Sequence, residues 1–454
     1  MPFSFLNEGA GPGMVDQLLS RILLHTSSAD ERYSEKKWKQ HESLALRLSS
    51  PAEGARTRVR VLLCDSGGLR RCRVVPWRRF GSICTTGLGL TSACMAQPAY
   101  SDCIAPDSGL DPVGEVRLVP ASPVVDLPWA PGHCMVLADL CTPPPPHGSM
   151  QESAPSLPSL PSWSGCPRAA LRRALVALKE EYGLSLMCGF ETEFVLLRRE
   201  QWAPEKHLQG GMPALCPVDG APYAHSRTTG AHAAVLDEMV DTLEALEAAD
   251  KLLLTREAIV GVAAKHGLEA SFVPKMSSSA AGCGCHCHLS LWKDGLNIMA
   301  AAPSQQDPGQ PHPSLSEQAS SFLADSPSAT PFLSLNAEYK AMDATANPHI
   351  ALTAIVAAGM LGSLVKCTLP PPLQVPPASL HPSEQSKRGI SRLPTSLREA
   401  LAQLEPGGNA WMIDELQAMY ATLLGPCLMR AYLAVRRAEV AEGPIDVPRL
   451  HLLY

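Results

Sequence analysis

Residues 281–292 have the sequence AGCGCHCHLSLW, the densest group of metal-capable side chains in the chain. Side chains of a β-strand alternate between its faces, so a strand here separates the imidazoles from the thiols. One face holds His286, His288 and Ser290, and the other holds Cys285, Cys287 and Leu289. Because one tetrahedral zinc ion could not easily use ligands from both faces, we expect the cysteines to pack in the core. A zinc or redox module built on Cys283, Cys285 and Cys287 is the less favoured alternative.

A pair of acidic residues marks a second predicted strand, in the sequence GFETEFVLL at 189–197. Alternation places Glu191 and Glu193 on one face, between apolar flanks. Like charges side by side are unfavourable unless a cation lies between them, which favours a functional role over a solvated strand face. Carboxylates combined with an imidazole suit Mg²⁺ or Mn²⁺ better than zinc, and such ions usually hold phosphate oxygens. For His286 and His288, a purely structural role stays equally open.

The composition indicates a globular, slightly acidic protein, since 45% of its 454 residues are hydrophobic and its formal net charge is -6. This charge argues against nucleic acid or an anionic membrane as the main partner, because both attract basic patches. The 15 cysteines and the absence of a basic, apolar leader predict a reducing, cytoplasmic location, with import into an organelle left open. No apolar run approaches the roughly 20 residues of a membrane-spanning helix.

The chain divides into segments of different composition. Residues 1–58 are expected to be peripheral, and 59–142 form a small sheet-rich domain with several short strand patterns. Residues 143–165 are rich in Pro and Ser and predict a linker or surface loop. The remainder, 166–454, alternates strands with long helices and includes a break rich in Pro, Ser and Gln at 302–330, predicted to be a mobile loop.

Local signals predict several elements within these segments. The sequence MVDQLLSRILLH at 14–25 could form a short amphipathic helix, and Ser66-Gly67-Gly68 is expected to turn a β-hairpin. A helix is expected over 166–183, where a glycine ends it. A buried helix begins at Pro348, with Asn347 as its N-cap.

Four motifs in order resemble glutamine synthetase, most closely the type I-related, glutamine-synthetase-like proteins of fungi and plants. They are GFETEF (189–194), AADKLLLTREAIVGVAAKHGLEASFVPK (248–275), GCGCHCHLSLW (282–292) and EYKAMDATANPHIALTAIVAAGMLG (338–362). Upstream, GEVRLVP and LPWAP resemble the N-terminal domain of the same family. The resemblance covers residues 59–454. It implies an α+β fold, in which a β-grasp-like domain precedes a catalytic domain made of an antiparallel sheet with surrounding helices.

The resemblance also implies an activity. The family uses ATP to join glutamate and ammonia, with two divalent ions in the active site, and it assembles into rings whose sites lie between neighbouring subunits. We therefore expect an ATP-dependent ligase of nitrogen metabolism that makes glutamine or joins a related amine or amino acid. Its cofactors would be ATP and Mg²⁺ or Mn²⁺, and its other ligands would be small molecules. Copies of the chain would assemble into a homo-oligomeric ring.

Site residues follow from the resemblance position by position. Glu191, His286 and Glu338 match the ligands of the metal ion beside the phosphates, and Glu193 matches a ligand of the second ion. Ser290 resembles a position that contacts the nucleotide. Lys340 stands where the family carries a basic residue near the phosphates. Taken alone, Glu338 and Lys340 could also be a surface pair on a strand.

Two family segments are missing between well-matched flanks. After Ala245 the sequence lacks the segment with two glutamates of the second metal site, and after Asn336 it lacks the segment with the substrate-binding arginines. No arginine occurs between Arg256 and Arg388, although bidentate arginine is the usual partner of carboxylates and phosphates. Skipped exons, a wrongly assembled gene or a genuine short isoform would each give such junctions. The alternative function is a catalytically impaired pseudoenzyme or truncated isoform that keeps the fold and acts as a regulatory or scaffold subunit.

Overall fold

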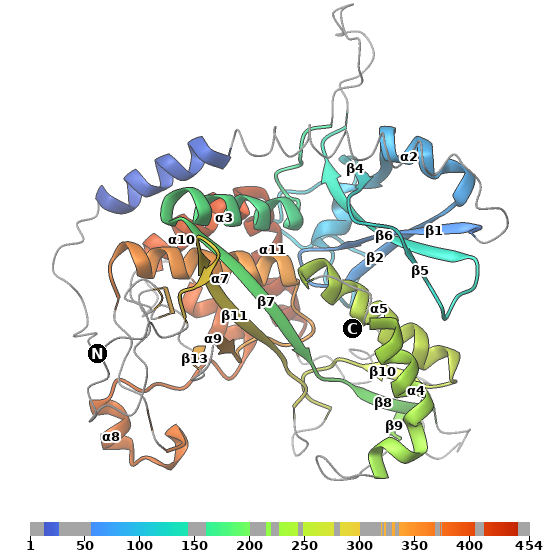
Figure 1. Ribbon diagram of the computed structural model, residues 1–454. Coiled ribbons are helices and arrows are strands. Elements are labelled where there is room, and N and C mark those ends of the chain that lie inside the picture. The colour runs from blue at the N-terminus through green and yellow to red at the C-terminus, as the bar shows by residue number, and fades with distance from the viewer. Residues whose placement is uncertain are drawn as a thin grey trace, which may run out of the picture.

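The structure is a computed structural model of the 454-residue chain (Figure 1). It describes residues 13–26, 56–143, 160–199, 215–218, 227–243, 248–276, 282–299, 319, 322–323, 329–331, 336–367, 373, 375–404 and 413–443. Most of the predicted linker at 143–165 and most of the predicted loop at 302–330 lie outside these residues. So does the predicted junction between Ala245 and Leu246.

Six strands form a sheet in the N-terminal part of the chain. They are β1 (Arg58–Cys64), β2 (Arg70–Pro76), β3 (Leu88–Thr91), β4 (Glu115–Pro120), β5 (Val125–Asp126) and β6 (His133–Cys141). The order is β2-β1-β6-β4-β3, with β5 beside β6; β1 runs parallel to β6, and the other pairs are antiparallel. Helix α2 (Phe80–Thr86) contributes Phe80 and Ile83 to the apolar core of this sheet.

The predicted hairpin turn is confirmed between β1 and β2, and it is buried. Gly68 has a φ of 91°, and a Cβ atom there would lie 1.9 Å from the carbonyl oxygen of Thr345. Glycine is required at this position because both the left-handed backbone and the close approach exclude a side chain. The turn therefore contacts the residues that precede α7 (Pro348–Leu364).

Two further sheets belong to the C-terminal part of the chain. A five-stranded sheet contains β7 (Leu184–Thr192), β11 (Cys285–Lys293), β12 (Leu296–Asn297), β13 (Ala329–Pro331) and β14 (Ala337–Tyr339). A three-stranded sheet contains β8 (Val195–Arg199), β9 (Leu215–Pro217) and β10 (Glu269–Ser271). In the five-stranded sheet, β11 pairs with β7 along its length and with β14 and β12 on the other side, always antiparallel.

Helices cover one face of the five-stranded sheet (Figure 1). The long helices are α3 (Pro167–Tyr182), α4 (Arg227–Leu243), α5 (Ala248–Lys265), α7, α10 (Ile413–Leu424) and α11 (Pro426–Glu442). The shorter ones are η1 (Trp77–Arg79), η2 (Ser92–Ala96), η4 (Pro377–Ser379), α8 (Pro382–Lys387) and α9 (Leu397–Leu404). The core between sheet and helices joins Leu291 of β11 to Leu178 of α3, Met360 of α7 and Met419 of α10.

The predicted N-terminal amphipathic helix is present at residues 13–26 and packs against this same core. Its residues Leu18 and Ile22 are fully buried. Arg21 reaches Glu181 of α3, with 2.8 Å between Nε and Oε2. This helix thus belongs to the packing of the C-terminal part of the chain.

Helix α7 begins as predicted. The side chain of Asn347 accepts hydrogen bonds from the backbone N–H groups of His349 and Ile350, at 2.9 and 3.2 Å. Pro348 occupies the first turn, where its missing N–H costs nothing. Asn347 Nδ2 also donates to the carbonyl oxygens of Cys64 and Asp65, at 3.4 and 2.9 Å. One side chain therefore caps a helix and ties it to the N-terminal sheet.

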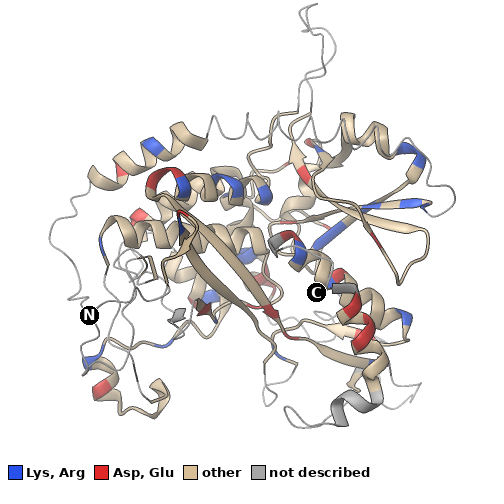
Figure 2. Cartoon of the chain, viewed as in Figure 1, with Lys and Arg blue, Asp and Glu red and all other residues tan. Residues whose placement is uncertain are grey.

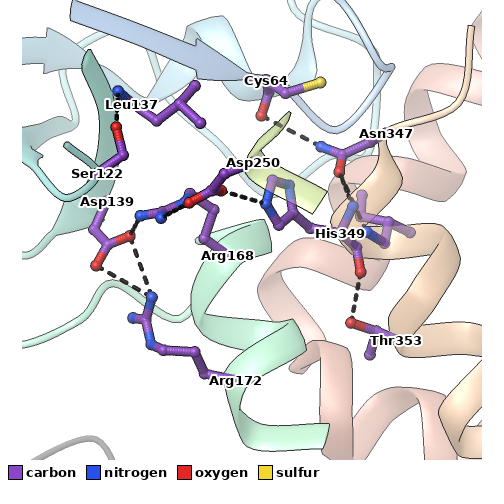
Figure 3. Close-up of polar contacts among 11 residues, drawn as sticks. Cys64, Ser122, Leu137, Asp139, Arg168, Arg172, Asp250, Asn347, His349 and Thr353 are labelled. Carbon is purple, nitrogen blue, oxygen red and sulfur yellow. Dashed lines mark hydrogen bonds and ion pairs between the residues drawn. The ribbon is translucent and has the colours of Figure 1, made fainter. Parts of the chain in front are cut away.

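A partly buried ionic network joins four elements where the N-terminal sheet meets the helices (Figure 3). Arg168 of α3 contacts both Asp139 of β6 and Asp250 of α5. Arg172 lies 3.2 Å from Asp139, and His349 Nε2 lies 3.0 Å from Asp250 Oδ1. Burial opposes the ionisation of Asp250, but the charge of Arg168 and the hydrogen bond with His349 outweigh it and hold the pKa of this carboxyl well below its usual range.

Among the residues that the structure describes, no single helix combines the length and hydropathy of a membrane span. Helices α10 and α11 satisfy those two criteria only as a pair, and the chain bends by 113° between them.

Candidate metal centre

The alternation predicted for β11 is confirmed by its burial. Cys285, Cys287 and Leu289 are buried, whereas the three polar residues between them are partly exposed. The buried side packs against α5 and α7. Cys283, Cys285 and Cys287 are free thiols, and two of them face away from the imidazoles. The polar side chains of β11 thus stand on the face of the sheet that the helices leave open.

Strand register brings the predicted ligands together from three strands. Glu191 of β7 lies directly opposite His286 of β11, and Glu338 of β14 lies directly opposite His288. Glu191 is the one charged residue of β7, and it stands next to the last residue of the strand, where the strand leads into β8 and the cartoon is red (Figure 2). The three strands therefore supply carboxylates and imidazoles to one small area.

The contacts in this area are short. His286 Nδ1 lies 2.8 Å from Glu338 Oε1 and 3.5 Å from Glu191 Oε2. Lys340 Nζ lies 2.6 Å from the same Glu338 oxygen. The Lys340 ammonium group lowers the pKa of Glu338, although burial of the carboxyl acts in the opposite direction. Glu338 is therefore held ionised at neutral pH, as a metal ligand must be.

The structure adds His288, which sequence reasoning placed on the right face but did not name as a ligand. Glu191, His288 and Glu338 offer ligand atoms that all lie within 4.8 Å of one another. His288 Nε2 lies 3.5 Å from Glu191 Oε2. Its other ring nitrogen, Nδ1, lies 3.3 Å from Asn336 Oδ1. The register of β11 with β14 was the missing signal, since it sets His288 opposite Glu338.

The two remaining predicted site residues lie at the edges of this cluster. Glu193 Oε2 accepts a hydrogen bond of 2.7 Å from the backbone N–H of Gly284, so its carboxylate is held by the chain entering β11. The hydroxyl of Ser290 accepts a hydrogen bond of 2.9 Å from the indole N–H of Trp292. Neither belongs to the group of metal-capable residues formed by Glu191, His288 and Glu338.

The residues present fit one divalent cation. Two carboxylates and two imidazoles converge, and His286 Nδ1 is buried with no hydrogen-bond partner in the described part of the chain despite its short contact with Glu338. A buried ring nitrogen 2.8 Å from a carboxylate oxygen is costly unless a proton or a cation lies between them. Glu191, Glu338 and His286 or His288 would hold the ion.

Arginine, in contrast, does not approach this face from α5. Arg256 is fully buried behind the sheet, with Nη2 4.0 Å from Cys285 Sγ and Nη1 3.1 Å from the carbonyl oxygen of Ala346. Burial lowers the pKa of its guanidinium group. Its role is therefore in packing α5 against β11 and the start of α7.

Carboxylates and imidazoles thus share the open face of an antiparallel sheet that helices cover behind, in an arrangement that could hold a metal ion. Comparison with known proteins specifies the class. Residues 164–246, 240–325 and 327–451 match the profile of the glutamine synthetase catalytic domain. The chain belongs to the glutamine synthetase family.

Relatives cover most of the chain. It is 26% identical to gamma-glutamylpolyamine synthetase GlnA3 of Streptomyces coelicolor over 457 aligned positions, covering 83% of this chain and 88% of the relative. It is 27% identical to glutamine synthetase of Methanocaldococcus jannaschii, covering 69% of this chain and 76% of the relative. A crystal structure described as a novel glutamine synthase homolog has the same fold, with a TM-score of 0.65 and 22% identity over 89% of this chain and 100% of the other.

The profile match is interrupted in two regions. Its first and second parts meet at residues 240–246, which include Ala245, and its second and third parts meet between 325 and 327, before Asn336. The first interruption includes the junction predicted after Ala245, whereas the third part of the match runs without a break through the junction predicted after Asn336.

Proposed function

We propose that this chain is an ATP-dependent ligase that joins the side-chain carboxylate of glutamate, or a related acid, to ammonia or another amine. The convergence of Glu191, Glu338 and two histidines on the open face of the five-stranded sheet supports this most directly. Membership of the glutamine synthetase family supplies the class of reaction.

The chemistry needs positive charge, because ATP and glutamate are both anionic. A divalent ion, when bound, would neutralise phosphate oxygens and stabilise the charge that develops during phosphoryl transfer. Lys340 adds a cationic group 2.6 Å from Glu338, at the rim of the same cluster. The Ser290 hydroxyl, farther along β11, is the proposed nucleotide contact. Mg²⁺ or Mn²⁺ is the ion that we propose for this reaction.

The amine substrate could be ammonia or a larger amine, since the relatives include both a glutamine synthetase and a gamma-glutamylpolyamine synthetase. Binding of the acid is expected to be weak. No arginine occurs between Arg256 and Arg388, and Arg256 lies behind the sheet. We further propose that the N-terminal sheet is the β-grasp-like domain of the family, that copies of the chain form a ring, and that the protein is cytoplasmic.

Hydroxamate formation tests the proposal. The full chain would be incubated with ATP, Mg²⁺ or Mn²⁺, glutamate and hydroxylamine, and then with ammonia or polyamines in place of hydroxylamine. We expect γ-glutamyl hydroxamate, and a loss on the order of 100-fold in Glu338→Gln, since that variant removes a charged ligand from the transition state. Glu384→Gln, on the exposed helix α8, is the matched control and should keep full activity.

The opposite outcome would be a folded chain that binds the nucleotide and the ion but forms no hydroxamate and no amide with any amine. That result would overturn the proposal and leave a regulatory or scaffold role.

A further inference from the structure

The N-terminal helix, residues 13–26, packs on an apolar surface that α3, α7 and α10 form together. Leu18 and Ile22 are fully buried and belong to the same apolar cluster as residues of all three helices. Val15 joins Leu361 of α7 in a second cluster. We refer to this surface as the docking surface; its buried residues include Leu178, Met360, Leu361 and Met419.

Glu181, at the end of α3, anchors the helix by charge. Its Oε2 lies 2.8 Å from Arg21 Nε, and its Oε1 lies 3.1 Å from His25 Nε2. Arg21 and His25 are one turn apart and therefore share a side of the helix. The Glu181 side chain is 7% exposed, whereas that of Arg21 is 50% exposed. The acid is thus built into the docking surface, and the helix brings the cation to it.

The chain connection does not determine where this helix lies. Residues 27–57 join it to β1, and a connection of that length can span on the order of 100 Å when extended. Figure 1 shows the helix (blue) beside α3, at the other end of the molecule from β1. The helix also lies outside the catalytic-domain match, which begins at residue 164, whereas the docking surface lies inside it. Contacts with the docking surface therefore hold the helix in place.

Only one side of the helix is used in docking. Leu23 and Leu24 are 54% and 74% exposed, so part of the apolar surface of the helix faces solvent. A helix this short is marginal on its own in water. The conformational entropy that its residues lose on ordering opposes the gain from the few that are buried. The helix should therefore be ordered when it is docked and unfold when it is released, which makes it a separate cooperative unit.

We propose that the docking surface is a binding site for an amphipathic helix, and that residues 13–26 of the same chain occupy it reversibly while the rest of the fold stays intact. The contacts define the class of ligand. It is a helix with apolar residues at the spacing of Val15, Leu18 and Ile22, and with a cation that meets Glu181. The inference does not rest on the proposed function, since it involves no nucleotide, metal ion or amine.

Occupancy of the docking surface should be transmitted to the five-stranded sheet. The apolar cluster that holds Leu18 and Ile22 also contains Leu291 of β11 and Ala337 of β14. Release of the helix exposes part of this cluster to water, so the two strands lose apolar packing behind them. The binding site would thus regulate how firmly these strands are held.

The simpler alternative is a helix that forms a permanent part of the core. Under that alternative, the amides of the helix exchange with solvent only when the whole chain unfolds. An added helix would then find no place to bind.

Hydrogen exchange of the native chain, followed by mass spectrometry, separates the two. We expect residues 13–26 to exchange at least about tenfold faster than α7, because they open without global unfolding. Their exchange should not depend on the concentration of the chain, since the helix belongs to the chain on which it docks. A dependence on concentration would show instead that a second copy supplies the helix.

Binding of a labelled peptide with the sequence of residues 13–26 tests the site itself. In the full-length double variant Leu18→Asp and Ile22→Asp, two buried charges should release the attached helix. Fluorescence anisotropy should then show saturable binding of the peptide. Its affinity should be at least about tenfold higher than for the native chain, where the attached helix competes at a high effective concentration. Hydrogen exchange of β11 and β14 should be faster in this variant and return toward the native rate when the peptide is added.

Matched peptides locate the contact. A peptide with Ile22→Asp should not bind, whereas one with Leu24→Asp, changed on the exposed side, should bind as well as the native peptide. A peptide with Arg21→Glu should bind about threefold more weakly, and Glu181→Lys in the double variant should restore its affinity.

Four outcomes would overturn the inference: residues 13–26 exchange as slowly as α7, their exchange depends on chain concentration, the double variant fails to fold by circular dichroism, or the folded variant does not bind the peptide. Unchanged exchange of β11 and β14 after release of the helix would overturn its coupling to the sheet.

Discussion

Asn347 Nδ2 donates a hydrogen bond of 2.9 Å to the backbone oxygen of Asp65, so the residue that caps α7 also holds the turn between β1 and β2. Its Oδ1 meanwhile accepts from two backbone N–H groups of the helix. The junction between the N-terminal sheet and the helices therefore depends on one amide. Several measurable effects follow from this junction and from the ionic network beside it.

Replacing Asn347 should destabilise both sides of the junction. Asn347→Ala loses the helix cap, at about 1 kcal/mol, and the hydrogen bond to the Asp65 carbonyl, at about 0.5–1.5 kcal/mol because that oxygen still accepts from the Gly68 N–H. Asn347→Ser keeps an acceptor for the cap and loses the bonds to Cys64 and Asp65, so its effect should be intermediate. Urea denaturation of the purified variants measures this order. Equal losses for Ser and Ala would show that the cap contributes nothing.

Gly68 should tolerate no side chain. A Cβ atom would overlap the Thr345 oxygen, and the φ of 91° is strained for any other residue. Gly295, with a φ of 81° and nothing within 4 Å, is the matched control. Gly295→Ala should cost about 1–2 kcal/mol for the backbone alone, and Gly68→Ala roughly 1–3 kcal/mol more for overpacking. Thermal or urea unfolding compares the stability lost in the two variants. Equal losses would contradict the close approach of residue 68 to the Thr345 oxygen.

The contribution of His349 to stability should fall as the pH drops below neutrality. Burial lowers the pKa of this imidazole, although Asp250 beside it acts in the opposite direction. The unfolded chain, with a histidine pKa of about 6.5, then binds the proton more readily than the folded chain. The contribution of neutral His349 is present above that pH and is lost as the pH falls further.

The measurement is the free energy of unfolding at pH 7.5 and 5.5 in the native chain and in His349→Gln. Glutamine can still donate to Asp250 but does not titrate, so the variant should lose less stability than the native chain on acidification. A parallel loss in both proteins would assign the pH dependence to other groups.

Arg168, which is partly buried, and Arg256, which is fully buried, should respond differently to the same substitution. Arg168→Met leaves Asp139 and Asp250 without their shared cation and should cost about 3 kcal/mol, at the lower end for broken buried pairs because Arg172 still contacts Asp139. Arg256 forms no ion pair with a carboxylate among the described residues, so Arg256→Met should change stability by no more than about 1.5 kcal/mol. The denaturant concentrations at the midpoints of unfolding measure the stability that each variant loses. Equal losses in the two variants would show that Arg256 has an anionic partner.

Local rules predicted much of this structure. The turn at Gly68, the cap at Asn347 and the two faces of β11 each depend on one residue type and its near neighbours, so a single sequence was enough. The contribution of His288 required the pairing of β11 with β14, and the network around Arg168 required four elements that are distant in sequence. Contacts of this kind depend on register and packing, which a single sequence does not specify.

The alternation of side chains between the two faces of β11 has a consequence for how such a centre could change during evolution. Imidazoles and thiols alternate along the strand, so a slip of one residue in its pairing would bring Cys285 and Cys287 to the open face and bury the histidines. The same nine residues would then present soft sulfur ligands. The hydrogen-bond partners of β11 therefore decide whether the strand presents nitrogen or sulfur ligands to an ion. A single insertion in the strand could convert a nitrogen site into a sulfur site.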